Sequence, residues 1–595
     1  MQGVAPIAAN RDLPRIRLLA LTLGAALATA PVLSQTASEL AGPGFAPELR
    51  PLAGALVFTG DPGLGAPAGA EALSIRIAAV EIEGAFPEMA AANQATIARL
   101  TADRIPASEI FEAAQALEAA YAEAGFVLAR VVLPAQELRD GGSLRLTVVD
   151  GFVERIDTDA VPPPVRARIE GLVTPVAGRP GVRLEEIERA LLLAGDTFGV
   201  ALDSALARGD APGATQLVLD ARYRPVTGFV GFNRGLSSDL GSWSLEAGLE
   251  ANALLGLGET FYFRFSGHPS GEGDDGRGGL FSSTPRARTL AAGAVVPIGT
   301  DGLTFNIEGV ESRTTPRSGP DELASASRFD RLSLRVSYPW VRTRNRTLIT
   351  RLVFDAQSDR QDSLAADGAL PIYRDRLRVV RLGGTAVQRV GGGAGVVEFD
   401  ALASFGISAL GARSASDATP EVPLSRDGAD ASFSKLSLSV ELAQPVGERL
   451  VGVISARGQT AFGSPLLKSE QIGLSGAGLL SGVEPGAMVG DSGWLLRGEL
   501  RLPREINLGD APLSVTPYVF AATGGTQLHQ ASEFERSSQR GSTAGIGLEM
   551  VSLLGANFSS ATVRMELARG TWDDALLTED RRSDTRLSVA GTLRF

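Results

Sequence analysis

Residues 469–497 read S-E-Q-I-G-L-S-G-A-G-L-L-S-G-V-E-P-G-A-M-V-G-D-S-G-W-L-L-R, and this stretch decides the fold. It is too long and too rich in glycine to be a turn. It also keeps Leu, Ile and Val side chains, which a solvated linker would not favour. The residues that follow, W-L-L-R-G-E-L-R-L-P, alternate as a β-strand does. We expect a loop that folds back into the lumen of a transmembrane β-barrel, where its apolar side chains are sheltered.

Two alternatives compete with this interpretation. The stretch could be a mobile surface loop, although long structureless loops are uncommon in compact domains. The whole C-terminal part could be a soluble all-β sandwich or propeller. That architecture needs a continuous buried core, and it does not explain the signal peptide, the polar second strand face and the terminal Phe595 together.

The composition excludes several classes of site. The 595 residues include no Cys, so the chain has no disulfide and no thiolate metal site. Its two histidines, His268 and His529, stand far apart in the sequence, which argues against a His-dependent triad or a multi-histidine metal site. A net charge of -12 disfavours a nucleic-acid partner. We therefore expect no catalytic residues, no metal, no cofactor and no nucleic acid.

Hydropathy points to a membrane protein that spans with strands. After the N-terminus, no run of about 20 apolar residues occurs, so the sequence contains no candidate helical span. The mean hydropathy is +0.09, and the chain has 70 glycines and many short alternating segments. This combination is typical of an outer-membrane β-barrel.

The N-terminal residues 1–34 have the pattern of a secretory signal peptide. Arg11, Arg15 and Arg17 form a positive region, and Leu18 to Ala30 is apolar. Residues 35–73 are punctuated by Pro and Gly, which indicates a linker. At most a short helix fits residues 37–40. Export to the bacterial envelope follows from this leader.

Residues 74–151 and 152–224 each predict a small α+β domain, a reasonable size for one hydrophobic core. Apolar residues at helical spacing place the main helices at 107–124 and 183–194, with a shorter helix at 165–172. The predicted strands are 75–82, 126–133, 143–149, 152–158 and 215–221.

Residues 225–595 lose the helical period and predict a transmembrane antiparallel barrel of about sixteen strands. An even number closes such a barrel and leaves no strand edge unpaired in lipid. The last strand alternates and ends on an aromatic residue, Phe595, which we expect to be the signal for the barrel-assembly machinery. The predicted strands start near Val226, Gly241, Glu259, Arg288, Leu303, Arg331, Arg346, Asp375, Ala394, Phe433, Leu450, Trp494, Leu513, Thr543, Asn557 and Thr585.

Several segments resemble the outer-membrane transporters of two-partner secretion, the hemolysin/hemagglutinin activation-secretion family. Residues 118–156 are similar to the first POTRA domain of these transporters, and residues 184–225 are similar to the second. In the barrel, N-A-L-L-G-L-G-E-T (252–260), Y-P-W-V-R-T-R-N (338–345) and G-D-S-G-W (490–494) match the family. The matching POTRA positions are Tyr121, Gly125, Ala129, Pro134, Gln136, Gly141 and Gly151.

The resemblance also implies a site inside the barrel. The loop tip aligns with Leu480-Ser481-Gly482-Val483, where the family usually carries an arginine at the place of Ser481. The facing wall aligns with Phe520, Ala522 and Gly524, where the family carries an acid at the place of Ala522. Both halves of the usual ion pair are therefore missing together. We expect Ser481 and Ala522 to face each other, with the loop hairpin formed by Gly490, Asp491, Gly493 and Trp494.

The function implied by the resemblance is export of one large partner protein. POTRA domains in the periplasm would capture the unfolded cargo, and a monomeric barrel in outer-membrane lipid would conduct it. Hemolysins, adhesins and filamentous hemagglutinins are the usual cargo. The alternative is an assembly factor of the wider POTRA-barrel superfamily. A passive porin would leave the POTRA domains without a purpose. The family's N-terminal plug helix is not carried over, because the Pro-rich linker leaves little room for one.

Overall fold

The computed structural model describes residues 36–42, 44–45, 65–211, 213–271, 278–317, 324–365, 368–508, 511–533, 535–554, 558–575 and 581–595. The expected signal peptide and most of the expected linker lie outside these residues. The chain divides into two compact units, one made mainly of residues 52–223 and one made mainly of residues 224–595. Each is described by itself below.

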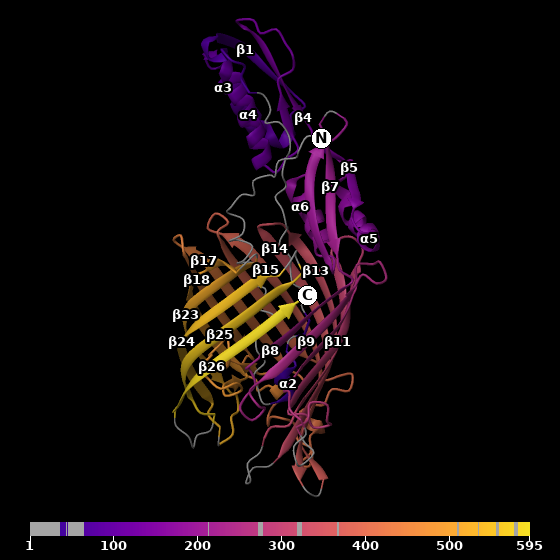
Figure 1. Ribbon diagram of the computed structural model, residues 1–595, viewed down its shortest axis with the longest axis vertical. Helices are drawn as coiled ribbons and strands as arrows, with labels where there is room; N and C mark the ends of the chain where they lie inside the picture. The colour runs from indigo at the N-terminus through magenta and orange to yellow at the C-terminus, as the bar shows by residue number, and fades with distance from the viewer. Residues whose placement is uncertain are drawn as a thin grey trace. The chain divides into compact units, whose positions relative to one another are not determined.

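The N-terminal unit consists of two α+β folds in sequence (Figure 1). The first has sheet order β2-β1-β4-β3, with β1 parallel to β4. The second has sheet order β5-β7-β6, with β5 parallel to β7. Among the described residues, no helix is both long enough and apolar enough to cross a membrane. The elements are η1 (Ala70–Ala72), β1 (Ser74–Glu83), η2 (Pro87–Met89), α3 (Ala90–Thr101), β2 (Arg104–Pro106), α4 (Ala107–Glu123), β3 (Arg130–Val132), β4 (Gly142–Val149), β5 (Phe152–Ala160), α5 (Pro163–Val173), η3 (Thr174–Val176), α6 (Leu184–Gly195), β6 (Val200–Arg208) and β7 (Ala214–Tyr223).

Two of the longer elements of this unit, α3 and β6, were not expected from the sequence. The buried face of α3 consists of Asn93, Thr96 and Leu100, so only one large apolar residue marks it. In β6, Val200, Ala201 and Leu202 are buried consecutively, which hides the alternation of a strand. Both elements are held by tertiary packing that a periodicity argument does not see.

The POTRA motif residues hold the first domain together. The Tyr121 side chain is fully buried, and its hydroxyl accepts the backbone N–H of Phe86 at 3.1 Å. The Gln136 side chain both donates to and accepts from the backbone of Arg145, at 2.7 and 2.9 Å, and it also donates to the Pro134 carbonyl. These bonds fasten the long connection between β3 and β4 onto β4.

Two of the three glycines of the motif, Gly125 and Gly151, stand next to the ends of elements. Gly125 ends α4 with φ of +96°, and its carbonyl accepts the N–H of Leu184 at the start of α6. Gly125 therefore joins the two domains as well as capping a helix. A Cβ on Gly151 would lie 1.9 Å from the Leu128 carbonyl oxygen, so no larger residue fits there without a shift of the backbone.

The C-terminal unit is a closed antiparallel barrel (Figure 1). Its wall segments are β8 (Val226–Asn233), β9 (Ser244–Asn252), β10 (Thr260–Gly267), β11 (Ala287–Ile298), β12 (Leu303–Thr314), β13 (Ser325–Arg342), β14 (Arg346–Ala365), β15 (Gly368–Val390), β16 (Gly395–Gly406), β17 (Ser434–Val446), β18 (Leu450–Thr460), β21 (Ser492–Arg501), β22 (Arg504–Leu508), β23 (Ala511–Gln527), β24 (Ser538–Leu553), β25 (Ser560–Asp573) and β26 (Arg581–Arg594).

The barrel has the sixteen strands that the sequence predicts. Both β21 and β22 pair with β23, so they are two pieces of one wall strand. The break falls at Leu502 and Pro503, because proline has no backbone N–H to donate to the ladder. Short turns join the strands at one rim, and most of the connections at the other rim are longer. The connection between β16 and β17 contains η4 (Ala415–Asp417).

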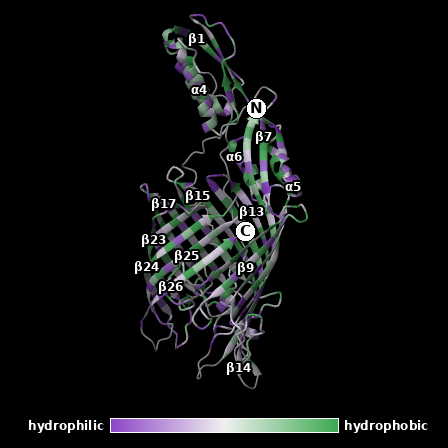
Figure 2. Cartoon of the chain, viewed as in Figure 1, coloured by the Kyte–Doolittle hydropathy of each residue, from purple (hydrophilic) through white to green (hydrophobic). Residues whose placement is uncertain are grey.

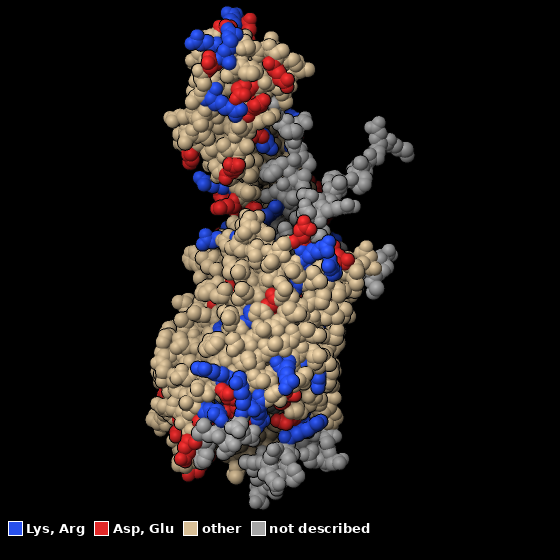
Figure 3. All heavy atoms as spheres, turned by 90° about the vertical axis from the view of Figure 1, so that its left-hand side faces the viewer, with Lys and Arg blue, Asp and Glu red and all other residues tan. Residues whose placement is uncertain are grey.

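The barrel wall is apolar outside and polar inside. On β10, Phe261 and Phe263 are exposed, while Tyr262 between them is buried. On β21, Leu496 is exposed, whereas its neighbour Arg497 is only 1% exposed. Figure 2 shows this alternation as green and white-to-purple residues along the strands. On the face shown in Figure 3, charged side chains gather at the lower end of the barrel, and the middle of the barrel wall carries few of them. This pattern suits a wall whose outer face meets lipid.

The barrel closes between its first and last strands. Five residue pairs join β26 to β8, from Ala590↔Asn233 to Arg594↔Phe229. Phe595 extends this ladder, since its backbone N–H and C=O both bond to Gly228 at 3.0 Å. The ring of Phe595 lies beside Gly228 as well. The terminal residue is therefore part of the closing seam.

Removing Phe595 is expected to lower the folded fraction of the barrel in outer membranes, because two backbone hydrogen bonds of the seam are lost with the terminal aromatic. The folded fraction is measured by heat-modifiable gel mobility. The Phe595→Ala variant keeps the backbone bonds and isolates the contribution of the ring. An unchanged folded fraction in the deletion would contradict the expected role of Phe595.

Candidate functional site

The candidate site is the loop between β18 and β21, residues 461–491. It contains η5 (Lys468–Glu470) and a two-stranded hairpin of β19 (Ile472–Gly473) and β20 (Val489–Gly490). Its apolar side chains pack against inward-facing residues of β21, β23 and β25, so the loop lies inside the barrel. The buried cluster consists of Ile472, Leu474, Leu480, Val483, Met488, Leu495, Ala522 and Trp572.

The base of the loop is anchored by one buried carboxylate. Glu470 is 1% exposed and pairs with Arg381 of β15 at 2.6 Å and with Lys435 of β17 at 2.9 Å. Gln357 of β14 donates to the same carboxylate at 3.2 Å. Arg381 also pairs with Asp355 at 2.7 Å. The two cations compensate the buried charge, which would otherwise be costly.

The neck of the loop is held by Asp491 of the G-D-S-G-W motif. Its fully buried carboxylate accepts the backbone N–H groups of Leu466 at 3.0 Å and His529 at 2.7 Å. It also accepts the side-chain amide of Gln471 at 2.9 Å. One carboxylate thus ties the two ends of the loop to the connection that follows β23. Trp494, the last residue of the motif, points outward and is exposed.

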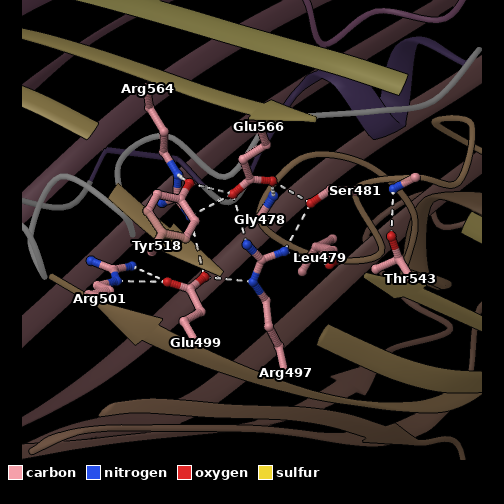
Figure 4. A network of polar contacts seen from close by, with 11 residues as sticks. Gly478, Leu479, Ser481, Arg497, Glu499, Arg501, Tyr518, Thr543, Arg564 and Glu566 are labelled. Atoms are coloured by element: carbon pink, nitrogen blue, oxygen red, sulfur yellow. Dashed lines mark hydrogen bonds and ion pairs between the residues drawn. The ribbon is translucent and has the colours of Figure 1, made fainter. Parts of the chain in front are cut away.

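The loop tip is held through the side-chain hydroxyl of Ser481. Ser481 is 1% exposed and donates to Glu566 of β25 at 2.5 Å, while Arg497 of β21 donates to the Ser481 oxygen at 2.9 Å (Figure 4). Arg497 also donates to the Leu479 carbonyl at 3.0 Å, and the Gly478 N–H points to Glu566 at 3.4 Å. The tip contributes no charged side chain to these contacts.

A contact between two glycines brings the tip against the wall. A Cβ on Gly482 would lie 2.3 Å from the Gly570 nitrogen, and a Cβ on Gly570 would lie 2.5 Å from the Gly482 carbonyl. The Gly482 N–H donates to the hydroxyl of Thr543 on β24 at 3.1 Å. The backbones of the loop and of β25 therefore touch directly, which no side chain larger than hydrogen would allow.

The charges that hold the tip form a network on the wall itself (Figure 4). Glu566 pairs with Arg497 and Arg564 at 2.8 Å each, and Tyr518 donates to it at 2.9 Å. Glu499 joins the network through Arg497 at 2.7 Å. Every buried charge in this group has an opposite charge beside it, with or without the loop tip.

The wall residues named from the sequence lie next to this network. Ala522 is the cross-strand neighbour of Arg497 on β21 and of Thr543 on β24, both of which bond to the tip. The partners of the Ser481 hydroxyl are Arg497 and Glu566, and not a side chain at position 522. Ala522 instead belongs to the apolar cluster.

The other two wall residues support this arrangement. The ring of Phe520 lies 3.9 Å below the guanidinium of Arg497, which fixes that side chain by a cation–π contact. A Cβ on Gly524 would lie 2.6 Å from the backbone oxygen of Trp494 and 3.5 Å from Leu474 of the loop. Gly524 therefore stands where the wall passes beneath the loop.

Arg497 and Glu566 were missed as site residues. A signal for them exists in the sequence, because R-G-E-L-R at 497–501 and R-M-E at 564–566 place charges at alternate positions of strands. Charges with period two on a membrane barrel face the lumen. What the pattern does not show is which lumen-facing charges from distant strands meet.

The N-terminal segment also lies inside the barrel, although residues 35–73 were expected to be a linker. The helix α2 (Ala37–Leu40) packs against β11 and β12. Phe45 stacks on Tyr262 at 4.3 Å, and its N–H donates to Glu308 at 2.9 Å. Arg331 donates to the Gly42 carbonyl at 2.7 Å. The helix is short, as expected, but these contacts dock it in the lumen.

The comparisons with known proteins agree with this architecture. The model of the family described as haemolysin secretion/activation protein ShlB/FhaC/HecB matches residues 213–550, which is more than half of the chain. The model of the ShlB-type POTRA domain matches residues 75–151. No curated protein sequence matches the chain.

Two solved structures share the fold. CdiB from Escherichia coli is 20% identical with a TM-score of 0.65, and the match covers 100% of both chains. CdiB from Acinetobacter baumannii is 14% identical with a TM-score of 0.58, and the match covers 99% of this chain and 100% of that chain. With its POTRA fold, its sixteen-stranded barrel and the family match over most of that barrel, this chain belongs to the haemolysin secretion/activation family, the outer-membrane transporters of two-partner secretion.

Proposed function

We propose that the protein exports one large partner protein, with residues 74–151 and 152–224 acting as two POTRA domains in the periplasm. They capture the cargo unfolded, and the barrel conducts it outward. An extended chain can add to an exposed sheet edge through main-chain hydrogen bonds. The sheets of this unit end in edge strands such as β2, β3 and β6, which offer such edges.

The observation that carries this proposal is the content of the barrel lumen. The loop 461–491 and the segment 36–45 both dock on inward-facing wall residues. A passive porin works with an open lumen, so these two segments favour a transporter whose channel is opened for its cargo. The POTRA domain that precedes the barrel supplies the site at which that cargo is recognised.

The partners follow from the same proposal. The cargo is a secreted hemolysin- or adhesin-like protein, which a gene beside this one would encode. The barrel-assembly machinery inserts the chain into the outer membrane, where it acts as a monomer. Within the part of the chain that the structure describes, no particular contact favours the alternative role as an assembly factor for other barrels.

Deleting the POTRA region, Ser74 to Arg222, is expected to leave a barrel that inserts but exports nothing. The cargo-recognising edges lie in the deleted part, whereas every wall strand lies in residues 226–594. Secretion of the co-expressed cargo is measured at matched membrane levels of the two barrels, with heat-modifiability as the control for folding. Normal secretion by the barrel alone would overturn the proposal.

A further inference from the structure

The turn between β9 and β10, residues 253–259, carries three leucines that no contact described above uses. It reads A-L-L-G-L-G-E. The side chains of Leu254, Leu255 and Leu257 are between 53% and 67% exposed. Water around three neighbouring leucines is unfavourable, because burying apolar surface is the main favourable contribution to folding and association. An exposed apolar turn of this kind on the barrel rim is expected to be covered by lipid or by an apolar partner.

The turn is built to keep these side chains outward. Glu259 is 1% exposed, and its two carboxylate oxygens accept the backbone N–H groups of Leu255 at 2.6 Å and Leu257 at 3.1 Å. The Ala253 N–H donates to the Glu259 carbonyl at 2.6 Å. A buried carboxylate that accepts backbone N–H groups fixes the path of the turn. The leucines therefore cannot fold back beneath it without breaking these bonds.

The turn directly follows an apolar part of the outer face of the barrel. The rungs below it pair Ala251 with Phe261 and Leu249 with Phe263, and both phenylalanines are exposed on the outer wall. Val226 of β8, which pairs with Ala251, is exposed on the same side. The outer face of these strands is therefore apolar up to the last rungs before the turn.

Two other turns on the same rim have a different character. The turn between β11 and β12 reads G-T-D-G at 299–302, and the turn between β17 and β18 reads G-E-R at 447–449. Glycine and charged residues suit contact with water. Three leucines on a turn of the same rim suit contact with acyl chains.

We infer that Leu254, Leu255 and Leu257 anchor the barrel in the membrane interface, inserted at the boundary between headgroups and acyl chains. Amphipathic elements that lie in this boundary bury their apolar side to a depth of about 5–10 Å. The proposed function places residues 74–224, which directly precede β8, in the periplasm, and on that basis alone this rim belongs to the periplasmic leaflet. The insertion itself depends only on the wall and the turn.

The absence of cysteine from the chain allows a direct test. An environment-sensitive fluorophore is attached to Leu255→Cys in the full-length protein, reconstituted in phosphatidylethanolamine and phosphatidylglycerol vesicles. Leu249→Cys on the lipid-facing wall and Glu448→Cys in a polar turn of the same rim are the reference positions. Quenching by aqueous iodide is compared with quenching by nitroxide-labelled lipid.

The expected result is that position 255 behaves like position 249, with several-fold weaker iodide quenching than position 448 and strong quenching by the labelled lipid. If position 255 behaves like position 448, the leucines face water and the anchor is ruled out, and a protein partner becomes the occupant to seek. Leu257→Cys repeats the test if labelling at 255 hinders insertion. The assay contains no cargo, so a failure of export leaves its outcome unaffected.

Discussion

Replacing Glu566 by Gln is expected to lower the free energy of unfolding of the barrel by about 3–5 kcal/mol, the range for breaking a buried ion pair. Glu566 is 2% exposed and accepts from Arg497, Arg564, Tyr518 and Ser481. The amide keeps the shape of the carboxylate but not its charge. It leaves the buried guanidinium of Arg497 and the partly buried guanidinium of Arg564 with one anion fewer between them.

The measurement is urea unfolding of the barrel in lipid vesicles, together with protection of the loop from a broad-specificity protease. The control is Asp400→Asn, since Asp400 pairs with Arg351 at 2.8 Å on a part of the wall that the loop tip does not touch. That half-exposed pair is expected to contribute about 0–1 kcal/mol. If Glu566→Gln cost no more than Asp400→Asn and left the loop protected, the network would not be what holds the tip.

The second large effect is expected at the glycine contact. Either Gly482→Ala or Gly570→Ala places a methyl group inside the backbone of the facing segment, so the tip must lift from β25. Overpacking of this kind costs about 1–3 kcal/mol. Because either change separates the same two backbones, the double variant is expected to cost less than the sum of the two.

Two other glycines provide matched controls for this experiment. A Cβ on Gly473, in the same loop, and a Cβ on Gly309, in the wall strand β12, would each meet no atom within 4 Å. Their replacement by Ala is expected to leave both the unfolding free energy and the protease protection of the loop close to those of the parent. Equal effects at all four positions would mean that the contact between Gly482 and Gly570 has no special role.

Much of the fold could be predicted because apolar and polar residues alternate regularly along its strands. The predicted strand starts at Val226, Leu303, Arg346 and Leu450 coincide with those of β8, β12, β14 and β18. Alternation along a strand is a local property, and it survives without knowledge of the partner strand. The helix α3 was missed for the opposite reason, since its buried face is formed mainly by small and polar residues.

The site was only partly predictable. The alignment of the loop led to Ser481 and to the neighbourhood of Ala522, because motifs such as G-D-S-G-W fix the loop relative to the wall. The partners Arg497 and Glu566 lie on β21 and β25, which are about seventy residues apart in sequence, and they meet because both side chains face the inside of the same curved wall. Likewise, no sequence pattern in residues 36–45 predicts that Phe45 stacks on Tyr262.

The uncharged tip has a consequence for how this sequence can change over generations. Where one partner of an ion pair lies on the loop tip and the other on the wall, a substitution of either partner leaves the other charge buried without a partner. The two positions must then be replaced together. Here Arg497 and Glu566 both belong to the wall and compensate each other. A substitution of Ser481 therefore removes hydrogen bonds but leaves no buried charge without a partner. Position 481 can thus change in evolution without a simultaneous change elsewhere.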